Sequence, residues 1–217
     1  MVIKLYTTEL SPSVRASIMA FEIFQVPYEN IEVNLSDKSM LDPEFLNKNP
    51  MRTVPVLEDE DFILHDGHAI LMYLADAYGT EDSWYPKDYK TRALVNQKLS
   101  FINEIIFSGF KKIAYSVVVE RRKTLMPQWI ETIEEGYSIM EKFLSKTTYI
   151  ATDDVTIADL SAYSNMSCLM YVIPVDRQKY PKTLKWCHVM EMQPYCKEFN
   201  NKSAATFGDL YKLIMSH

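Results

Sequence analysis

Ser11 is the residue whose type and position best suit chemistry in this chain of 217 residues. It follows an apolar run and stands directly before Pro12, and this pattern opens helices. The unpaired N–H groups and the positive dipole end of such a helix stabilise a nearby anion. From the residues alone, an ordinary helix cap explains Ser11 more simply.

The composition excludes several classes of site. The chain has only 5 Gly, no two of them close together, so neither a dinucleotide fingerprint nor a P-loop can be built. Its 3 Cys lack a C-x-x-C motif and its 4 His lack a ligand spacing. These patterns argue against a disulfide scaffold and against a zinc site. We therefore expect no bound metal.

Charge and hydropathy limit the partners. The net charge is −6, and the densest basic run, at residues 121–123, holds three cations, so we expect no nucleic-acid binding. No apolar run approaches the ~18 residues of a membrane span, and there is no apolar leader at the N-terminus. We expect a cytoplasmic protein that does not bind membranes.

Strand and helix signals alternate over the first 79 residues. Period-two apolar runs predict strands, and Ser, Asp or Pro before an apolar face predicts a helix start. The predicted order βαβαββα has strands at 2–6 and 28–35, a hairpin of 54–57 with 62–64, and helices at 11–24, from 42, and at 66–79. Because a helix separates the first two strands, we expect a parallel pair, with the hairpin antiparallel.

All later segments have a helical period. Residues 80–89 break the pattern, and we interpret them as a linker between a domain of residues 1–79 and a helical domain of residues 90–217. We expect one long helix or two in tandem over 91–119, helices from Pro127 and Thr156, shorter ones at 182–190 and 194–200, and a last one from Phe207. Thr156 and Asp159 form a capping-box pattern, which we interpret as structural.

This order of motifs resembles the glutathione transferase family over the whole chain, and more narrowly its insect delta/epsilon type. The segments that carry the resemblance are residues 10–15, 49–55, 66–70 and 155–159. It implies a thioredoxin-like α/β domain that binds glutathione, followed by an all-α domain that binds the second substrate. It also implies a homodimer that conjugates the glutathione thiolate to hydrophobic electrophiles in the detoxification of xenobiotics.

By this resemblance Ser11 is the catalytic residue. Its hydroxyl would donate a hydrogen bond to the sulfur of glutathione and so favour the thiolate. A Cys at this position would indicate mixed-disulfide chemistry. Neither Ser11 nor Ser13 is Cys, so a reductase is disfavoured.

The resemblance assigns one group of glutathione contacts to the segment before the third strand. Pro55 would follow a cis peptide bond, and Val54 would expose its backbone to the cysteinyl part, with Thr53 among the binding residues. Arg52 stands where the family usually has a His that binds the glycyl carboxylate, and Arg can bind a carboxylate bidentately. Met40 replaces a second family His and cannot make a polar contact.

A second group of contacts holds the γ-glutamyl end. Here the family's Glu-Ser-Arg is replaced by Asp66, Gly67 and His68. The carboxylate is kept for the α-amino group, the hydroxyl is lost, and a His is only partly charged near pH 7. His68 is equally explained as an exposed first-turn residue. We expect glutathione binding that these replacements weaken and Arg52 partly restores.

The electrophile would bind between the two domains. The resemblance assigns an apolar pocket to six residues, namely Asn103, Phe107, Phe110, Tyr115, Val119 and Phe207. For each of them, core packing is at least as good an explanation. A carrier of hydrophobic ligands with the same fold is the alternative function, and a glutathione-dependent isomerase or peroxidase would differ only in its electrophile.

Overall fold

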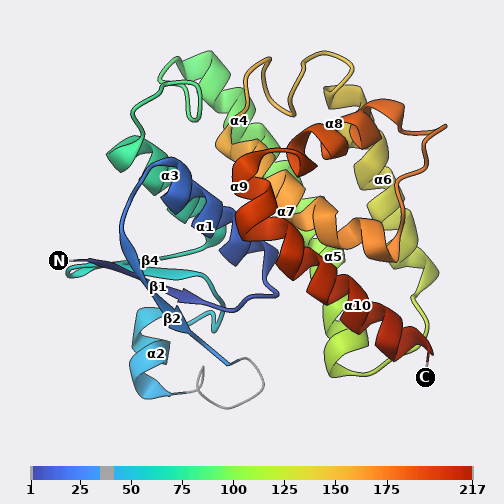
Figure 1. The fold of residues 1–217 in the computed structure, drawn as a ribbon, viewed down its shortest axis with the longest axis horizontal. Helices are drawn as coiled ribbons and strands as arrows, with labels where there is room; N and C mark the ends of the chain where they lie inside the picture. Colours follow the sequence, from blue (N-terminus) through green and yellow to red (C-terminus); the bar gives the residue numbers. More distant parts are fainter. Residues whose placement is uncertain (1, 35–41, 217) are drawn as a thin grey trace.

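The computed structural model describes residues 2–34 and 42–216. A small sheet with its helices lies beside a larger bundle of helices, and the chain passes once from the first part to the second (Figure 1). This is the predicted fold class, a thioredoxin-like α/β domain followed by an all-helical domain. Leu35 and Met40, for which the sequence made predictions, lie outside the described residues.

Four strands form one sheet in the order β2-β1-β3-β4. Their bounds are β1 (Ile3–Thr7), β2 (Tyr28–Glu32), β3 (Val56–Asp59) and β4 (Phe62–His65). As predicted, β1 and β2 are parallel, whereas β3 is antiparallel to both β1 and β4. β3 begins two residues later than predicted because Pro55 has no N–H group for the ladder.

Helices cover both faces of the sheet (Figure 1). Leu5 and Leu57 belong to the main core, together with apolar residues of α1 (Pro12–Ile23) and α3 (Gly67–Tyr78). Val56 points to the other face and packs with Phe45 of α2 (Pro43–Lys48). The alternation of side chains along each strand therefore separates two clusters.

The three helix starts in this domain agree with the sequence prediction. Ser11 caps α1, Asp42 caps α2 and Asp66 caps α3, each by accepting a hydrogen bond from a backbone N–H of the first turn. Pro12 and Pro43 occupy the first positions of their helices.

The second part of the chain is helical. Its elements are α4 (Tyr89–Phe101), η2 (Ile102–Phe107), α5 (Ser108–Ala114), η3 (Tyr115–Val119), α6 (Pro127–Phe143), α7 (Ile157–Val172), α8 (Pro181–Glu191), α9 (Pro194–Cys196), η4 (Lys197–Asn201) and α10 (Lys202–Ser216). η2, η3 and η4 are π-helical. The helix predicted over 91–119 is thus one continuous run, with two π-helical segments that a period of 3.6 does not reveal.

The last helix begins earlier than predicted. α10 starts at Lys202 and continues directly from η4, so Phe207 lies inside it. The polar residues Asn200 and Asn201 favour turns in isolation, which concealed this continuity.

α7 is the central helix of the bundle. Every residue from Ile157 to Leu169 is buried, so neighbours surround it on all sides. Thr156 and Asp159 form the predicted capping box at its start. α1 packs against α7, which joins the sheet domain to the helical domain.

Candidate functional site

The pairing of the strands brings three predicted site segments to one end of the sheet. β1 runs parallel to β4 because both are antiparallel to β3, so their carboxyl ends coincide with the start of β3. Tyr6 pairs with Val56, and Val56 with His65. Three features therefore lie at the same end of the sheet, namely the segment that leads to Ser11, the Val54–Pro55 bond and Asp66.

Ser11 occupies the N-cap of α1. Its Oγ accepts a hydrogen bond from Val14 N at 3.4 Å, and its own N–H donates to Thr8 O at 3.1 Å. The hydroxyl proton is not used by these bonds, and the side chain is half-buried. A hydroxyl at a helix N-terminus that keeps its proton can donate to an anion bound at that end of the helix.

Arg15 fixes the segment before Ser11. The side chain is 1% exposed, and its Nη1 donates to the carbonyl of Leu10 at 3.0 Å. Its Nη2 donates to Ser164 O at 2.8 Å and to Cys168 Sγ at 2.9 Å, and its Nε donates to Asn200 Oδ1 at 2.9 Å. This guanidinium therefore bonds the loop before α1 to α7 and to η4.

Asn49 organises the segment before β3. It is fully buried, and its Nδ2 donates to the carbonyl and to the Oγ1 of Thr53, at 2.7 and 3.0 Å. Its Oδ1 accepts from Met51 N at 2.9 Å. The peptide bond between Val54 and Pro55 is cis. The buried side-chain amide of Asn49 therefore fixes the backbone of residues 51–53.

Arg52 lies on the outside of that loop. Its φ is 54°, in the left-handed region that non-glycine residues seldom adopt. The side chain is exposed, and no ion pair joins it to any residue that the structure describes. Its guanidinium is accordingly available to a carboxylate from solution.

Asp66 and Gly67 form the start of α3. Asp66 has a φ of 80°, is exposed, and accepts from His68 N at 2.9 Å and Ala69 N at 3.1 Å through Oδ1 alone. Gly67 is buried against α1, since a Cβ built on it would lie 3.0 Å from the Cβ of Ser13. The N-termini of α1 and α3 therefore approach each other closely at this position, and glycine permits it.

His68 is engaged with the helical domain. Its Nε2 lies 2.7 Å from Ser161 Oγ on α7. Burial lowers the pKa of His68, and the nearby negative charge of Asp66 opposes this shift only partly. The side chain is therefore not the exposed first-turn residue that the sequence allowed, and its ring bonds to the partner domain.

The six residues predicted for the electrophile pocket occupy different environments. Phe110 and Phe207 are 4% and 2% exposed, and their rings pack at 5.1 Å, so both belong to the core. Asn103 is exposed and Phe107 half-buried, whereas Tyr115 and Val119 are 57% and 61% exposed. Asn103 and Phe107 belong to η2, and Tyr115 and Val119 to η3. The two π-helical segments thus set the direction of four of the six side chains.

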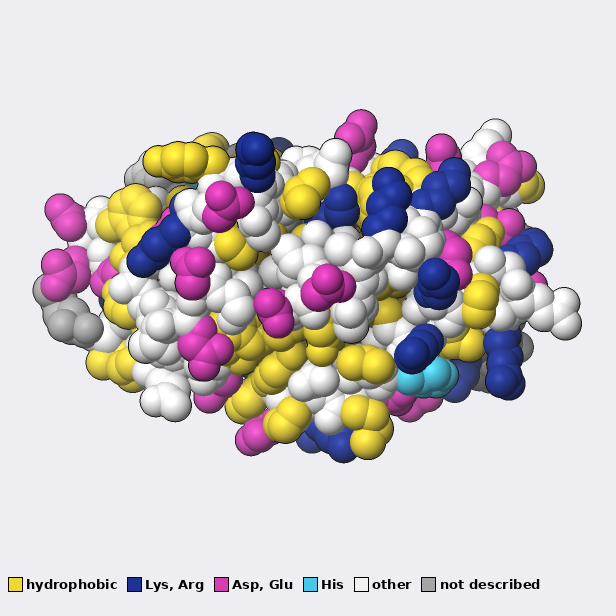
Figure 2. Space-filling view, turned by 90° about the horizontal axis from the view of Figure 1, so that it is seen from above, with side chains coloured by type: hydrophobic (Ala, Val, Ile, Leu, Met, Phe, Trp, Pro, Cys, Tyr) yellow, Lys and Arg dark blue, Asp and Glu magenta, His cyan; other side chains and the backbone are white. Residues whose placement is uncertain are grey.

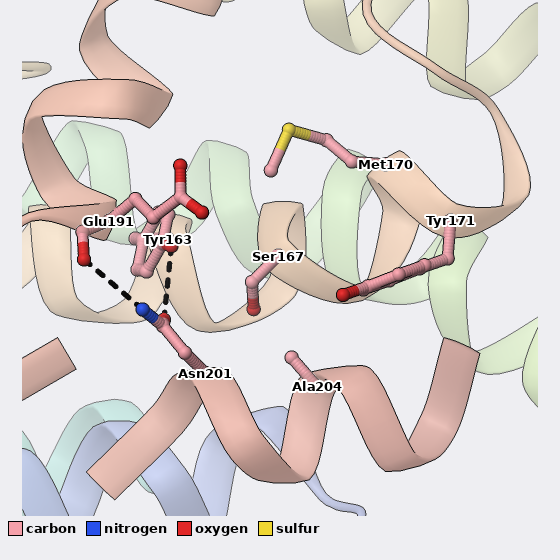
Figure 3. A pocket seen from close by; sticks show the side chains of 7 residues that line it. All are labelled: Tyr163, Ser167, Met170, Tyr171, Glu191, Asn201 and Ala204. Atoms are coloured by element: carbon pink, nitrogen blue, oxygen red, sulfur yellow. Dashed lines mark hydrogen bonds between the residues drawn. The ribbon is translucent and has the colours of Figure 1, made fainter. Parts of the chain in front are cut away.

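A small cavity of about 120 Å³ lies between α7 and α10 (Figure 3). Its lining comprises Tyr163, Ser167, Met170, Tyr171, Glu191, Asn201 and Ala204. The hydroxyl of Tyr163 donates to Asn201 Oδ1 at 3.1 Å, and Asn201 Nδ2 donates to the carbonyl of Glu191 at 3.1 Å. These two hydrogen bonds hold the start of α10 against α7 and α8. The lining includes none of the six residues predicted for the electrophile pocket.

Sequence reasoning missed the residues that hold the site in place. Arg15, Asn49 and Ser161 received no role, although a lone Arg among the apolar residues of α1 is a recognisable signal of a buried charge. Their partners are distant in sequence, so only the folded chain reveals them.

Comparison with known proteins places this chain in a family. Residues 5–82 match the family model for the glutathione S-transferase N-terminal domain, and residues 106–203 match that for the C-terminal domain. Glutathione S-transferase 1 of Manduca sexta is 38% identical over 188 residues, which is 86% of each chain. The chain belongs to the glutathione S-transferase family.

Solved structures of the family superpose closely on this one. An epsilon-class glutathione S-transferase from the housefly, Musca domestica, has a TM-score of 0.93 at 34% identity and covers 98% of both chains. A glutathione transferase homologue from Drosophila mojavensis, solved with bound glutathione, has a TM-score of 0.93 at 38% identity and covers 98% of this chain and 97% of its own.

These likenesses establish the protein as a glutathione transferase of the insect delta/epsilon type, with glutathione as its co-substrate. Among the described residues, no three His, Cys, Asp or Glu side chains are grouped so as to hold a metal ion. No helix in that part of the chain is long and apolar enough to span a membrane.

Proposed function

We propose that Ser11 stabilises the thiolate of glutathione, which then attacks the electrophilic carbon of a hydrophobic second substrate. A carbon–sulfur bond forms, and the bond to the leaving group, chloride in a chlorinated nitrobenzene, breaks with release of the anion. The observation that carries this proposal is the position of Ser11 at the N-terminus of α1. This N-terminus lies at the same end of the sheet as Val54 and Asp66. The thiol loses its proton to solvent, and the Ser11 hydroxyl donates to the resulting anion. The helix dipole adds to this stabilisation.

The remaining glutathione contacts are proposed for residues at the same end of the sheet. Val54 offers its backbone to the cysteinyl part, and Thr53 lies beside it in the loop that Asn49 holds. Asp66 has one carboxylate oxygen outside its two capping bonds, which suits the α-amino group. Arg52 suits the glycyl carboxylate, because its guanidinium is exposed and without an ion pair in the described chain.

Gly67 and His68 contribute to glutathione binding in a reduced way. Gly67 supplies only its backbone N–H at the start of α3. The ring of His68 is bonded to Ser161, so its part in binding is to fix the start of that helix against α7. Two side-chain contacts of the family motif are thereby absent, at about 0.5–1.5 kcal/mol each.

The electrophile is proposed to bind beside η2 and η3. Asn103, Phe107, Tyr115 and Val119 form the accessible part of the site, and the buried Phe110–Phe207 pair supports it from the core. Proximity to the thiolate then supplies the main catalytic effect. Hydrophobic electrophiles suit this largely apolar and aromatic surface.

Two further proposals rest on the likeness to the family. We infer a homodimer in which Ala69, Met72 and Tyr73 of α3 take part, because all three are only half-buried in the isolated chain. We also infer a cytoplasmic location, which agrees with the three free and buried cysteines.

Conjugation of glutathione to a chlorinated nitrobenzene tests the role of Ser11. Wild type is expected to turn over, and Ser11→Ala to lower kcat roughly 100-fold near neutral pH, since the thiolate loses its hydrogen-bond donor. Asp88→Ala is the matched control, because Asp88 caps α4 through Thr91 N and lies outside the site. Tight binding of hydrophobic dyes without any turnover would instead indicate the carrier.

Titration with glutathione tests the binding residues. Arg52→Ala is expected to weaken binding at least tenfold, because a charged hydrogen bond is worth about 1.5–3 kcal/mol. The exposed Arg177→Ala serves as control. No detectable binding by wild type at several millimolar glutathione would contradict the whole proposal.

A further inference from the structure

A second and larger cavity lies at the end of the helical domain where α6 and α8 meet. Its volume is about 410 Å³, within the range of small-molecule sites. The residues that line it are Leu144, Ser145, Lys146, Thr147, Thr148, Asp153, Lys182, Lys185, Trp186 and Val189. None of them belongs to the proposed glutathione site, and α8 lies on the side of the bundle away from the sheet (Figure 1).

The lining of this cavity is positively charged although the chain is acidic. Its side chains carry three positive charges and one negative, against a net charge of −6 for the protein. Lys146, Lys182 and Lys185 are exposed, and none forms an ion pair with any described residue. Figure 2 shows the molecule from above, where Lys and Arg side chains are more numerous over the right-hand part than over the left.

The acidic groups near the cavity are already engaged. Asp153 Oδ1 accepts from Thr148 N at 2.9 Å and from Thr148 Oγ1 at 3.1 Å. The carboxylate of Glu141 accepts from the backbone N–H groups of Lys182 and Thr183, so it caps the start of α8. Neither carboxylate forms a salt bridge with Lys146, Lys182 or Lys185.

A fourth lysine, Lys98, is affected by the positive charge of Lys146. Lys98 of α4 is 7% exposed, and its Nζ lies 4.0 Å from the centre of the Phe143 ring and donates to Gln97 Oε1 at 2.7 Å. Burial, and then the positive charge of Lys146, lower the pKa of Lys98. The charges of Lys98 and Lys146 therefore repel each other.

The hydroxyl groups of the lining already donate their protons within the protein. Ser145 donates to Lys142 O, Thr147 to Tyr149 O and Thr148 to Asp153. Since these protons are in use, an anion in the cavity would be bound by the ammonium groups. Lysines act as mobile point charges, which suit a compact, multiply charged phosphate, whereas bidentate carboxylate sites favour arginine.

We propose that the cavity lined by Lys146, Lys182 and Lys185 binds a small phosphorylated organic molecule. Its phosphate would lie among the three ammonium groups, and its apolar part would contact Leu144, Val189 and the edge of Trp186. The cavity is a second site, independent of the glutathione site.

Calorimetric titration of the full chain with inorganic pyrophosphate tests this proposal. Wild type is expected to bind, and the double variant Lys182→Gln/Lys185→Gln to lose at least tenfold in affinity. The matched control is Lys87→Gln/Lys90→Gln, which removes two exposed lysines at the same spacing elsewhere and should change the affinity less than twofold. Conjugation activity should be unchanged in both variants.

Three results would overturn the proposal. An equal loss in both double variants would mean that pyrophosphate responds only to overall charge. Loss of pyrophosphate binding when glutathione is saturating would place the anion in the glutathione site. The third result is that wild type binds no pyrophosphate, even at a concentration 10-fold above the one at which it binds glutathione. This would exclude a phosphate site altogether.

Discussion

Arg15 on α1 donates a hydrogen bond of 2.8 Å to the carbonyl oxygen of Ser164 on α7. The same guanidinium bonds to the carbonyl of Leu10, one residue before Ser11. No carboxylate among the described residues pairs with this buried charge, which is held by carbonyl, amide and thiol acceptors alone. The geometry of the proposed active site is thereby coupled to the contact between the two domains.

Arg15→Met is expected to lower the free energy of unfolding by at least about 3 kcal/mol, because it leaves several buried acceptors without a donor. Urea unfolding measures this change. Arg177→Met removes an exposed arginine and should stay within about 0.5 kcal/mol of wild type. A small effect of Arg15→Met would mean that water replaces the guanidinium at this contact.

Gly67→Ala is expected to destabilise the protein, because the added Cβ lies 3.0 Å from the Cβ of Ser13. Ser13→Gly removes this contact, so the double variant should recover part of the loss. Thermal unfolding of the four proteins gives a coupling energy that we expect to exceed about 0.5 kcal/mol. Additive effects would contradict the close approach of the two helices.

Gly67→Ser in the Ser13→Gly background tests the missing hydroxyl. With the contact relieved, we expect glutathione to bind up to about tenfold more tightly, since one neutral hydrogen bond is worth about 0.5–1.5 kcal/mol. Gly67→Ala in the same background is the control. If Ala tightened binding as much as Ser, the gain would not come from a hydroxyl contact.

His68 makes stability depend on pH. The pKa of the folded side chain is lowered by burial, whereas the unfolded one titrates near about 6.5. Protons therefore bind more readily to the unfolded chain, and stability should fall as the pH decreases below that value, by up to about 1.4 kcal/mol per unit. His68→Gln should flatten the stability curve between pH 7 and 5. His188→Gln removes an exposed histidine and is the control.

Glu58 links β3 to two lysines. It accepts from Lys48 at 2.7 Å and from Lys4 at 3.1 Å, and bonding to Lys48 is the main cause that lowers its pKa to about 2. Its contribution to stability is present above about pH 4.5 and lost as the pH falls towards 2. Glu58→Gln should cost about 1 kcal/mol at neutral pH, reduced by solvent screening, and little at pH 2. Glu44, which is 82% exposed, provides the control as Glu44→Gln.

Local signals made much of the fold predictable. Ser11, Asp42 and Asp66 were recognised as helix caps because a cap depends on residues within one turn of itself. The parallel first pair of strands followed from the helix between them. The order of elements was therefore accessible from the sequence, and the strand limits were less so, since pairing partners determine where a ladder ends.

The side-chain partners of the candidate site were not predictable in this way. Arg15 meets Ser164 and Asn200 across 149 and 185 residues of chain, and no local pattern encodes such contacts. His68 likewise finds Ser161 across 93 residues. The proposed electrophile surface stays a prediction, and a uniform α-helical period does not describe η2 and η3, which are π-helical.

The π-helical segment η2 has a consequence for changes in chain length. A π-helical turn closes i→i+5 hydrogen bonds, so it holds one residue more than the i→i+4 turn of an α-helix. Deleting one residue between Ile102 and Phe107 would let this turn close as regular α-helix, and the helix on either side would keep its orientation. Phe110 would then stay against Phe207. Deleting one residue within α4 would instead turn one part of the helix by about 100° against the other, so this helix can be shortened in η2 but not in α4.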